Sequence, residues 1–201
     1  MSLKLKQKAT VTIPPMEAGT YPAVCVGIVD LGEQHNTMWN KYENRLLVIM
    51  EFPDETVEID GEQKPRWISR EFSASLHDKS NFAQFISQWR GKSFTDEEKQ
   101  EGFDLKKLLA EPGFATVSVE DGKDGKQYNK LMSIVPVPKR MPAPTPVSEL
   151  LWHDMDEWND EMFAKLPGWI QDRIKKSTQY QKQHAPAETI EVKGDESGCP
   201  I

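Results

Sequence analysis

Three short stretches of the sequence place aromatic rings beside positively charged side chains. They run over residues 39–45, 64–72 and 123–130. Aromatic faces can stack on flat rings of a ligand, and Lys and Arg can neutralise its phosphates. The side chains with these properties are Trp39, Lys41, Tyr42, Arg45, Arg66, Trp67, Arg70, Lys126, Tyr128 and Lys130. This composition predicts contacts with a polyanion that carries planar groups.

Catalytic patterns are weak by comparison. The four histidines are scattered, and the sequence has no Cys-x-x-Cys, no Walker-type loop and no Gly-x-Ser-x-Gly. The acidic triplet at 96–98 opens a helical stretch, where negative charge suits the helix dipole. The acids of residues 154–161 are typical of a solvated helix face. We therefore expect no enzyme activity, no metal and no cofactor. A nuclease would lack an identifiable metal site.

The elements that must position the aromatic and basic residues are mainly strands. Apolar and β-branched runs predict three strands, and Gly27 inside the first is a candidate bulge. The period then changes to three and four residues, which predicts a helix capped by Asp78 or Ser80 and ended by Gly91. Thr95 and Glu98 form a capping box, which predicts a further short helical stretch. A hairpin follows across the turn DGKDGK. The ranges are strands 19–31, 45–52 and 66–75, the helix 78–91, and strands 113–120 and 127–137.

Three strands, a helical connection and a two-stranded hairpin follow the order of the OB-fold. The predicted fold class is thus mainly β, α+β overall. It is a five-stranded OB-like barrel with a helical insert between strands 3 and 4, plus a C-terminal helical appendix. In such a barrel strands 2 and 3 and two adjoining loops form the ligand face. All three aromatic and basic stretches lie on those elements, which predicts binding of single-stranded DNA. Each aromatic residue has packing in the core as its alternative role.

The composition changes after the last strand. We expect an N-terminal arm at 1–12, the OB-like domain at 13–140, a Pro-rich linker at 141–147, an acidic helical appendix at 148–183 and a disordered acidic tail at 184–201. The appendix would hold helices at 148–163 and 169–180. It could compete with DNA for the basic face, in which case truncation after Arg140 would tighten DNA binding. The alternative is a protein–protein adaptor in which the Trp-bearing C-terminal helices bind a partner.

Several stretches resemble single-stranded DNA-binding proteins with an OB-fold that are encoded by bacteriophages and prophages. They are IPPMEAGTYPAVCVGIVDLGEQ, PRWISREFSASLHDKSNFAQFISQWRGKSFTDEE, FDLKKLLA and PVPK, and WRGKSFT is the most distinctive part. The similarity covers roughly residues 13–141. It implies binding without strong sequence preference, in phage DNA replication or recombination.

The C-terminal end is similar to the acidic tail of single-strand-binding proteins, whose terminal Pro-Phe recruits replication and repair enzymes. Asp195 and Glu196 supply the acids, and Pro200 and Ile201 stand in place of Pro-Phe. These four residues are the expected contacts for replication or recombination proteins. A homo-oligomer is left open.

The net charge of −7 lies mostly in the C-terminal third, which has 11 Asp and Glu against 6 Lys and Arg after Arg140. This balance excludes a wholly basic, histone-like mode of binding. No apolar run approaches the ~20 residues that span a bilayer, and the first residues lack the apolar region of a secretory signal. We therefore expect no membrane contact and a cytoplasmic location in a bacterial host cell.

Overall fold

The computed structural model describes residues 13–59 and 61–184. Two long neighbouring strands, β1 (Gly19–Asn36) and β2 (Lys41–Ile59), have apolar side chains on both faces. Ala23 and Cys25 of β1 lie in one hydrophobic core, whereas Val24 and Val26 lie in a second. Successive side chains of a strand point to opposite faces. The continuous apolar runs of the sequence therefore belong to strands that are covered on both sides.

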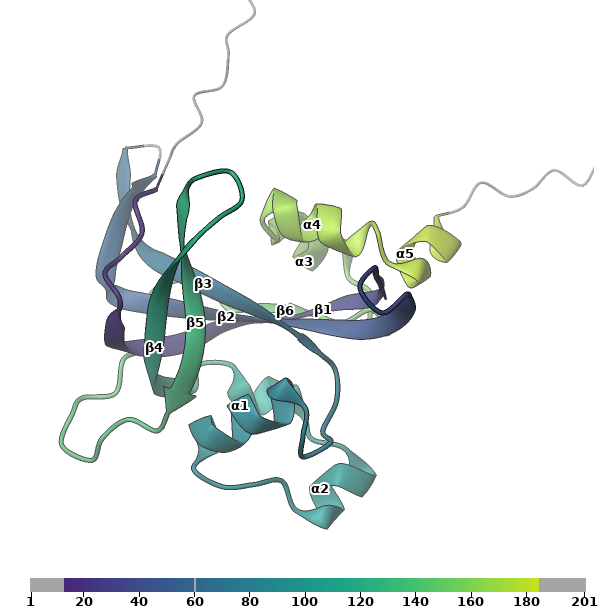
Figure 1. The fold of residues 1–201 in the computed structure, drawn as a ribbon, viewed down its shortest axis with the longest axis horizontal. Helices are drawn as coiled ribbons and strands as arrows, with labels where there is room; N and C mark the ends of the chain where they lie inside the picture. The colour runs from purple at the N-terminus through teal and green to yellow at the C-terminus, as the bar shows by residue number, and fades with distance from the viewer. Residues whose placement is uncertain (1–12, 60, 185–201) are drawn as a thin grey trace, which may run out of the picture.

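The sheet is antiparallel except at one short strand. Its hydrogen-bonded order is β3-β2-β1-β4-β5, and β6 pairs in parallel with β1. Figure 1 shows that the long strands curl into a half-barrel. The prediction of a mainly β fold is confirmed. The remaining strands are β3 (Glu62–Ser73), β4 (Pro112–Asp121), β5 (Gln127–Val135) and β6 (Leu151–His153).

Arg70 joins the two edges of the curled sheet. Its Nη1 donates to the carbonyl oxygens of Leu131 at 3.1 Å and Met132 at 2.6 Å, both on β5. The guanidinium also lies over the rings of Phe72 and Phe85, with 4.9 and 5.6 Å to the ring centroids. Desolvation by burial lowers the pKa of Arg70. This cation, expected to contact phosphate, thus has a structural role between β3 and β5.

Gly27 marks an irregularity in β1, as the sequence predicts. The register between β1 and β2 shifts between Cys25 and Gly27. A Cβ at Gly27 would lie 2.8 Å from the Cδ1 of Ile49. A side chain at position 27 would therefore displace that of Ile49, so glycine suits this contact.

The helices on the side of the first hydrophobic core begin and end where their capping residues predict. α1 (Asn81–Arg90) has Ser80 as its N-cap, and Gly91 ends it in the left-handed conformation with φ 66°. Thr95 and Glu98 form both bonds of a capping box at α2 (Asp96–Glu101). A short 3-10 helix follows at Leu105–Leu108. The apolar stripe of α1 packs into the first core.

The opposite face of the sheet is covered by the C-terminal segment, residues 147–184. Its helices are α3 (Asp160–Lys165), α4 (Gly168–Ile174) and α5 (Thr178–Gln183). Figure 1 shows them across the sheet from α1 and α2. The second core joins both parts, and its buried members are Val24, Val26, Val29, Leu31, Leu47, Ile49, Leu151, Met155, Leu166, Ile170 and Ile174. The C-terminal segment is therefore a packed layer of this fold.

The structure differs from the helix predicted over residues 148–163. Leu151–His153 form strand β6, and helix begins only at Asp160. β1 pairs with β4 only up to Val24, so its edge further along is free and pairs with β6 at Gly27–Val29. The second predicted helix, 169–180, is divided into α4 and α5. Long-range strand pairing overrides the local helical pattern in this segment.

His153 makes the stability of this layer dependent on pH. The residue is 2 % exposed, neither ring nitrogen has a hydrogen-bond partner, and the ring lies 5.0 Å from that of Trp158. Desolvation lowers its pKa from 6.5, despite an opposing effect of Asp154. The folded protein therefore binds a proton at this ring less readily than the unfolded chain, which takes one up as the pH falls through about 6.5.

We expect the free energy of unfolding to fall by about 1 kcal/mol between pH ~7.5 and ~5.5 through His153. Urea denaturation at both values measures the loss, and the same experiment on His153→Phe isolates this residue. An equal loss in both proteins would contradict the prediction.

None of the described helices has the length and apolar character that crossing a membrane requires.

Candidate nucleic-acid interface

A groove of about 580 Å³ lies between β3, the β4–β5 hairpin and α4. Three aromatic side chains from these separate elements line it: Trp67, Tyr128 and Trp169. Their exposed fractions are 36 %, 50 % and 55 %, so each presents part of its ring to solvent. We call this hollow the aromatic groove. Its remaining lining residues are Ile13, Pro15, Val57, Ile59, Lys64, Pro65, Arg66, Ile68, Ser69, Gln127, Asn129, Ser148 and Pro167.

Trp67 is held by a buried carboxylate. Its Nε1 donates to Oε2 of Glu51 at 3.0 Å, and Glu51 is fully buried on the facing strand. The same carboxylate accepts from the backbone N–H groups of Val147 at 2.7 Å and Ser148 at 3.2 Å. Glu51 therefore fixes the indole and also ties the start of the C-terminal segment to the sheet.

Tyr128 is positioned by the turn of its own hairpin. Its hydroxyl donates to Oδ2 of Asp124 at 2.6 Å, and this bond raises the pKa of Tyr128 and lowers that of Asp124. A Cβ at Gly122 would lie 2.4 Å from Cε2 of the ring, so glycine lets the ring lie on the turn. The ring is thus oriented before any ligand arrives.

Two cations line the same groove. Nη1 of Arg66 donates to the neutral carbonyl oxygen of Pro14 at 2.6 Å, and within residues 13–59 and 61–184 the guanidinium has no ion-pair partner. Lys64 pairs with exposed Glu62 at 3.2 Å, a pair that water screens. Arg66, Trp67 and Tyr128 are therefore predicted site residues that the structure brings together.

Trp169 is not among the site residues that the sequence predicts. The sequence places it in a helix of the expected appendix, where its ring has no assigned surface. Pro167 and Gly168 indicate the start of a helix just before Trp169, but they do not indicate which way its side chain points. Only the packing of α4 on the second core turns Trp169 toward the groove.

A second group of predicted residues lies at the other end of β2. Trp39 and Tyr42 are 70 % and 58 % exposed at the turn between β1 and β2. Lys41 pairs with Glu43 at 2.5 Å. Arg45 follows on β2, four residues after Lys41. These residues do not line the aromatic groove.

Arg45 belongs to an ion-pair network that limits its freedom. Its Nε lies 2.8 Å from Oε1 of Glu71, and its Nη1 donates to Ser73 at 2.7 Å. Arg173 of α4 lies 2.9 Å from the same Glu71 oxygen. Desolvation raises the pKa of Glu71, but the hydrogen bonds and charges of Arg173 and Arg45 outweigh it and leave that pKa lowered. The network joins α4 to β2 and β3.

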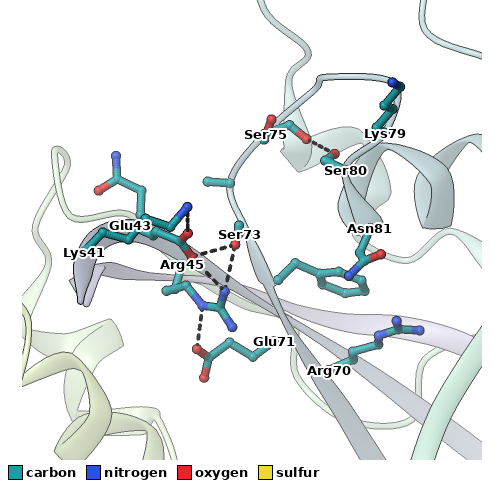
Figure 2. A pocket seen from close by; sticks show the side chains of 13 residues that line it. Lys41, Glu43, Arg45, Arg70, Glu71, Ser73, Ser75, Lys79, Ser80 and Asn81 are labelled. Carbon is teal, nitrogen blue, oxygen red and sulfur yellow. Dashed lines mark hydrogen bonds and ion pairs between the residues drawn. The ribbon is translucent and has the colours of Figure 1, made fainter. Parts of the chain in front are cut away.

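A polar hollow of about 580 Å³ adjoins this network, between the start of β2, the end of β3 and the start of α1. Figure 2 shows Arg45 bonded to Ser73 and Glu71 on one side, with Arg70 and Lys79 on the other. Lys79 is exposed, and its ammonium has no ion-pair partner within the described ranges. The hollow thus has cations on both sides, and its acids, Glu43 and Glu71, pair with the cations of the Arg45 side.

The last two predicted basic residues lie on the β4–β5 hairpin. Lys126 is exposed in its turn, next to Gln127 of the groove lining. Lys130 pairs with Glu120 at 2.8 Å, and both side chains are about half exposed. The predicted tail contacts Asp195, Glu196, Pro200 and Ile201 lie outside the described residues.

Within residues 13–59 and 61–184, no three His, Cys, Asp or Glu side chains gather in a way that could hold a metal ion. Cys25 is buried, and desolvation raises the pKa of its thiol to about 12. That thiol stays protonated at neutral pH and is a poor nucleophile.

No protein-family model and no curated protein sequence matches the chain.

The aromatic groove is therefore the strongest candidate site on geometric grounds. It combines three partly exposed rings with two cations. The rings, Trp67, Tyr128 and Trp169, come from segments that are about 60 and 40 residues apart in the sequence. The rings offer stacking surfaces, and the cations suit phosphate groups.

Proposed function

We propose that the protein binds single-stranded DNA without strong sequence preference, with the aromatic groove as its main contact. The observation that supports this most is the convergence of Trp67, Tyr128 and Trp169 beside Lys64 and Arg66. Stacking on aromatic rings tolerates any base, and cations follow the backbone rather than the sequence. Both kinds of contact favour an unpaired strand, whose base faces are accessible.

We also propose that the curled sheet forms an OB-like barrel. Strands β1 to β5 with α1 and α2 between β3 and β4 are compatible with an OB-like barrel. Arg70 bridges β3 to β5 and so brings the ends of the curled sheet together. An OB-like barrel places its ligand on strands 2 and 3 and the adjoining hairpin. The aromatic groove has that location.

The sequence resemblance extends the proposal to a non-catalytic role in phage or prophage DNA replication or recombination, in the cytoplasm of a bacterial host. Partner proteins would be recruited through Asp195, Glu196, Pro200 and Ile201. This context rests on the residues that carry the resemblance.

We expect Trp169→Ala to weaken the binding of oligo-dT by about 5- to 150-fold, because one stacked base is worth about 1–3 kcal/mol. Trp169 is 55 % exposed, so its removal leaves both cores intact. Titration of a fluorescent oligo-dT with the full-length protein measures the affinity. Met132→Ala, an exposed position of β5 outside the groove, is the control.

The dependence of the binding affinity on salt concentration is an independent test of the proposal. Binding by phosphate contacts weakens as salt rises from about 50 to about 200 mM, with a slope of about −0.7 per contact for single strands. No oligo-dT binding at the lower salt, or equal affinities of the Trp169 and Met132 variants, would refute the proposal.

The adaptor alternative depends on tryptophans of the C-terminal segment that face solvent. Trp152 packs against the first core, and Trp158 packs against the second. The Trp158 ring lies 4.8 Å from Phe163 and 5.7 Å from Tyr180. Trp169 alone among the tryptophans of this segment is largely exposed, and it lines the groove. The packing of these side chains favours the DNA-binding proposal.

A further inference from the structure

The turn between β1 and β2 holds large apolar side chains in solvent. Met38 is 81 % exposed, Trp39 70 % and Tyr42 58 %. The turn is ordered by side-chain bonds, because Asn36 Oδ1 accepts from the N–H of Met38 at 3.1 Å. Asn40 has a positive φ of 47°. Hydrogen bonds hold this turn in place, and its large apolar side chains lie outside both cores. They therefore present a surface on which a ligand can bind.

The surroundings of this turn repeat the chemistry of the aromatic groove. Lys41 and Arg45 follow Trp39 on the first part of β2, and Arg173 shares a hollow of about 370 Å³ with Arg45. Glu43 and Glu71 are each paired with these cations. We call Trp39, Lys41 and Tyr42 the end cluster. It offers two exposed rings and one lysine, and the arginines behind them are ion-paired with Glu71.

The end cluster is remote from the aromatic groove. Trp67 lies opposite Glu51 in the β2–β3 register, and Lys41 is ten residues before Glu51 on β2. At about 3.3 Å per residue the two levels are up to about 33 Å apart. Between them the side chains of Leu47 and Ile49 are buried under the C-terminal segment. Bases of a bound strand therefore have no exposed ring to stack on along the middle of β2.

The aromatic groove and the end cluster are connected through α4 and the ion-pair network. α4 has Trp169 at the aromatic groove and Arg173 in the ion network next to the end cluster. Glu71 on β3 joins Arg173 to Arg45. A DNA strand that left the aromatic groove along β3 and α4 would pass Glu71, which is paired with Arg45 and Arg173, on its way to Lys41.

We propose that the end cluster is a second stacking site for the same DNA strand, so that tight binding requires a strand long enough to reach both sites. This inference rests on the proposed function, because the aromatic groove supplies the first site. Short oligomers would occupy the groove alone. Longer ones would gain the second contact as an intramolecular step.

The test is an oligo-dT series from about 4 to about 16 nucleotides, the range of sites on single OB-folds. Wild-type protein is expected to show a step in affinity at an intermediate length. The double variant Trp39→Ala/Tyr42→Ala is expected to lose the step, with affinity for the longest oligomer reduced about tenfold or more and affinity for the shortest unchanged. Trp169→Ala is expected to weaken both, and Met132→Ala neither.

The outcomes separate the two proposals. If the double variant binds the longest oligomer as wild type does, the end cluster serves another partner and this inference is overturned, while the groove stands. Equal losses at all lengths also overturn it, because the sites would then not be separate. If no protein in the series binds oligo-dT, the proposed function itself fails. Urea denaturation of the double variant verifies the fold, since both rings lie outside the two cores.

Discussion

Replacement of Ile170 by alanine is expected to lower the free energy of unfolding by about 2–5 kcal/mol. Ile170 is fully buried in the second core, between α4 and the sheet. Its truncation removes apolar contacts and leaves a cavity that the surrounding strands cannot close, because β1 and β2 are fixed by pairing on both sides. Urea denaturation followed by circular dichroism gives the change.

Trp169→Ala is the matched control for this prediction. It removes a larger side chain from the preceding position of the same helix, but one that is 55 % exposed. We expect a change below about 1 kcal/mol, as for other surface substitutions. If Ile170→Ala were as mild as its control, the C-terminal segment would be a dispensable appendix rather than a layer of the fold.

The second core also changes how the acidic segment should be tested as a competitor for DNA. Truncation after Arg140 would remove β6 and α3 to α5 and uncover Val24, Val26, Val29, Leu31, Leu47 and Ile49. A loss of binding in that truncated chain would report unfolding or aggregation. Substitutions of exposed acids, such as Asp156→Asn and Glu157→Gln, test the competition with both cores intact.

The other large effect is expected from Glu51→Ala, at about 3 kcal/mol or more of lost stability. The substitution leaves three part-buried donors, the Nε1 of Trp67 and the N–H groups of Val147 and Ser148, without their acceptor. Each unsatisfied buried donor costs about 1–3 kcal/mol. The free energy of unfolding from urea titrations measures the sum.

Glu58→Ala is the control, since Glu58 is an exposed glutamate of the same strand. Glu51→Gln retains one acceptor oxygen and is expected to lie between the two. The indole of Trp67 should also lose its fixed orientation in Glu51→Ala, so oligo-dT affinity should fall together with stability. Equal stabilities of Glu51→Ala and Glu58→Ala would show that the carboxylate does not hold the C-terminal segment.

Much of the local structure could be predicted because its signals are contained within a few residues. Ser80 and Gly91 bound α1, Thr95 with Glu98 caps α2, and the DGKDGK turn joins β4 to β5. Backbone hydrogen bonds at helix ends and turns are satisfied by nearby side chains, so residue type and spacing are sufficient. The mainly β character follows in the same way from the apolar runs.

The second layer could not be predicted from such patterns. A continuous apolar run indicates burial on both faces, but it does not say which segment provides the cover. Leu151–His153 have a local helical pattern, yet they form a strand because the edge of β1 beyond Val24 is open. Pairing between residues more than 100 positions apart has no local signature.

The candidate site was predicted only in its composition. Arg66, Trp67 and Tyr128 meet in one groove, whereas Trp39, Lys41 and Tyr42 lie at the far end of β2.

Chain chemistry alone determined which residues carry rings and charge. Tertiary structure decided which of these groups are available. Arg70 is held by the carbonyl oxygens of β5, and Arg45 by Glu71, 26 positions away. Trp169 gains its place through the packing of α4. A charge is free or paired, and a ring exposed or buried, according to neighbours that only the folded chain brings within a few ångströms.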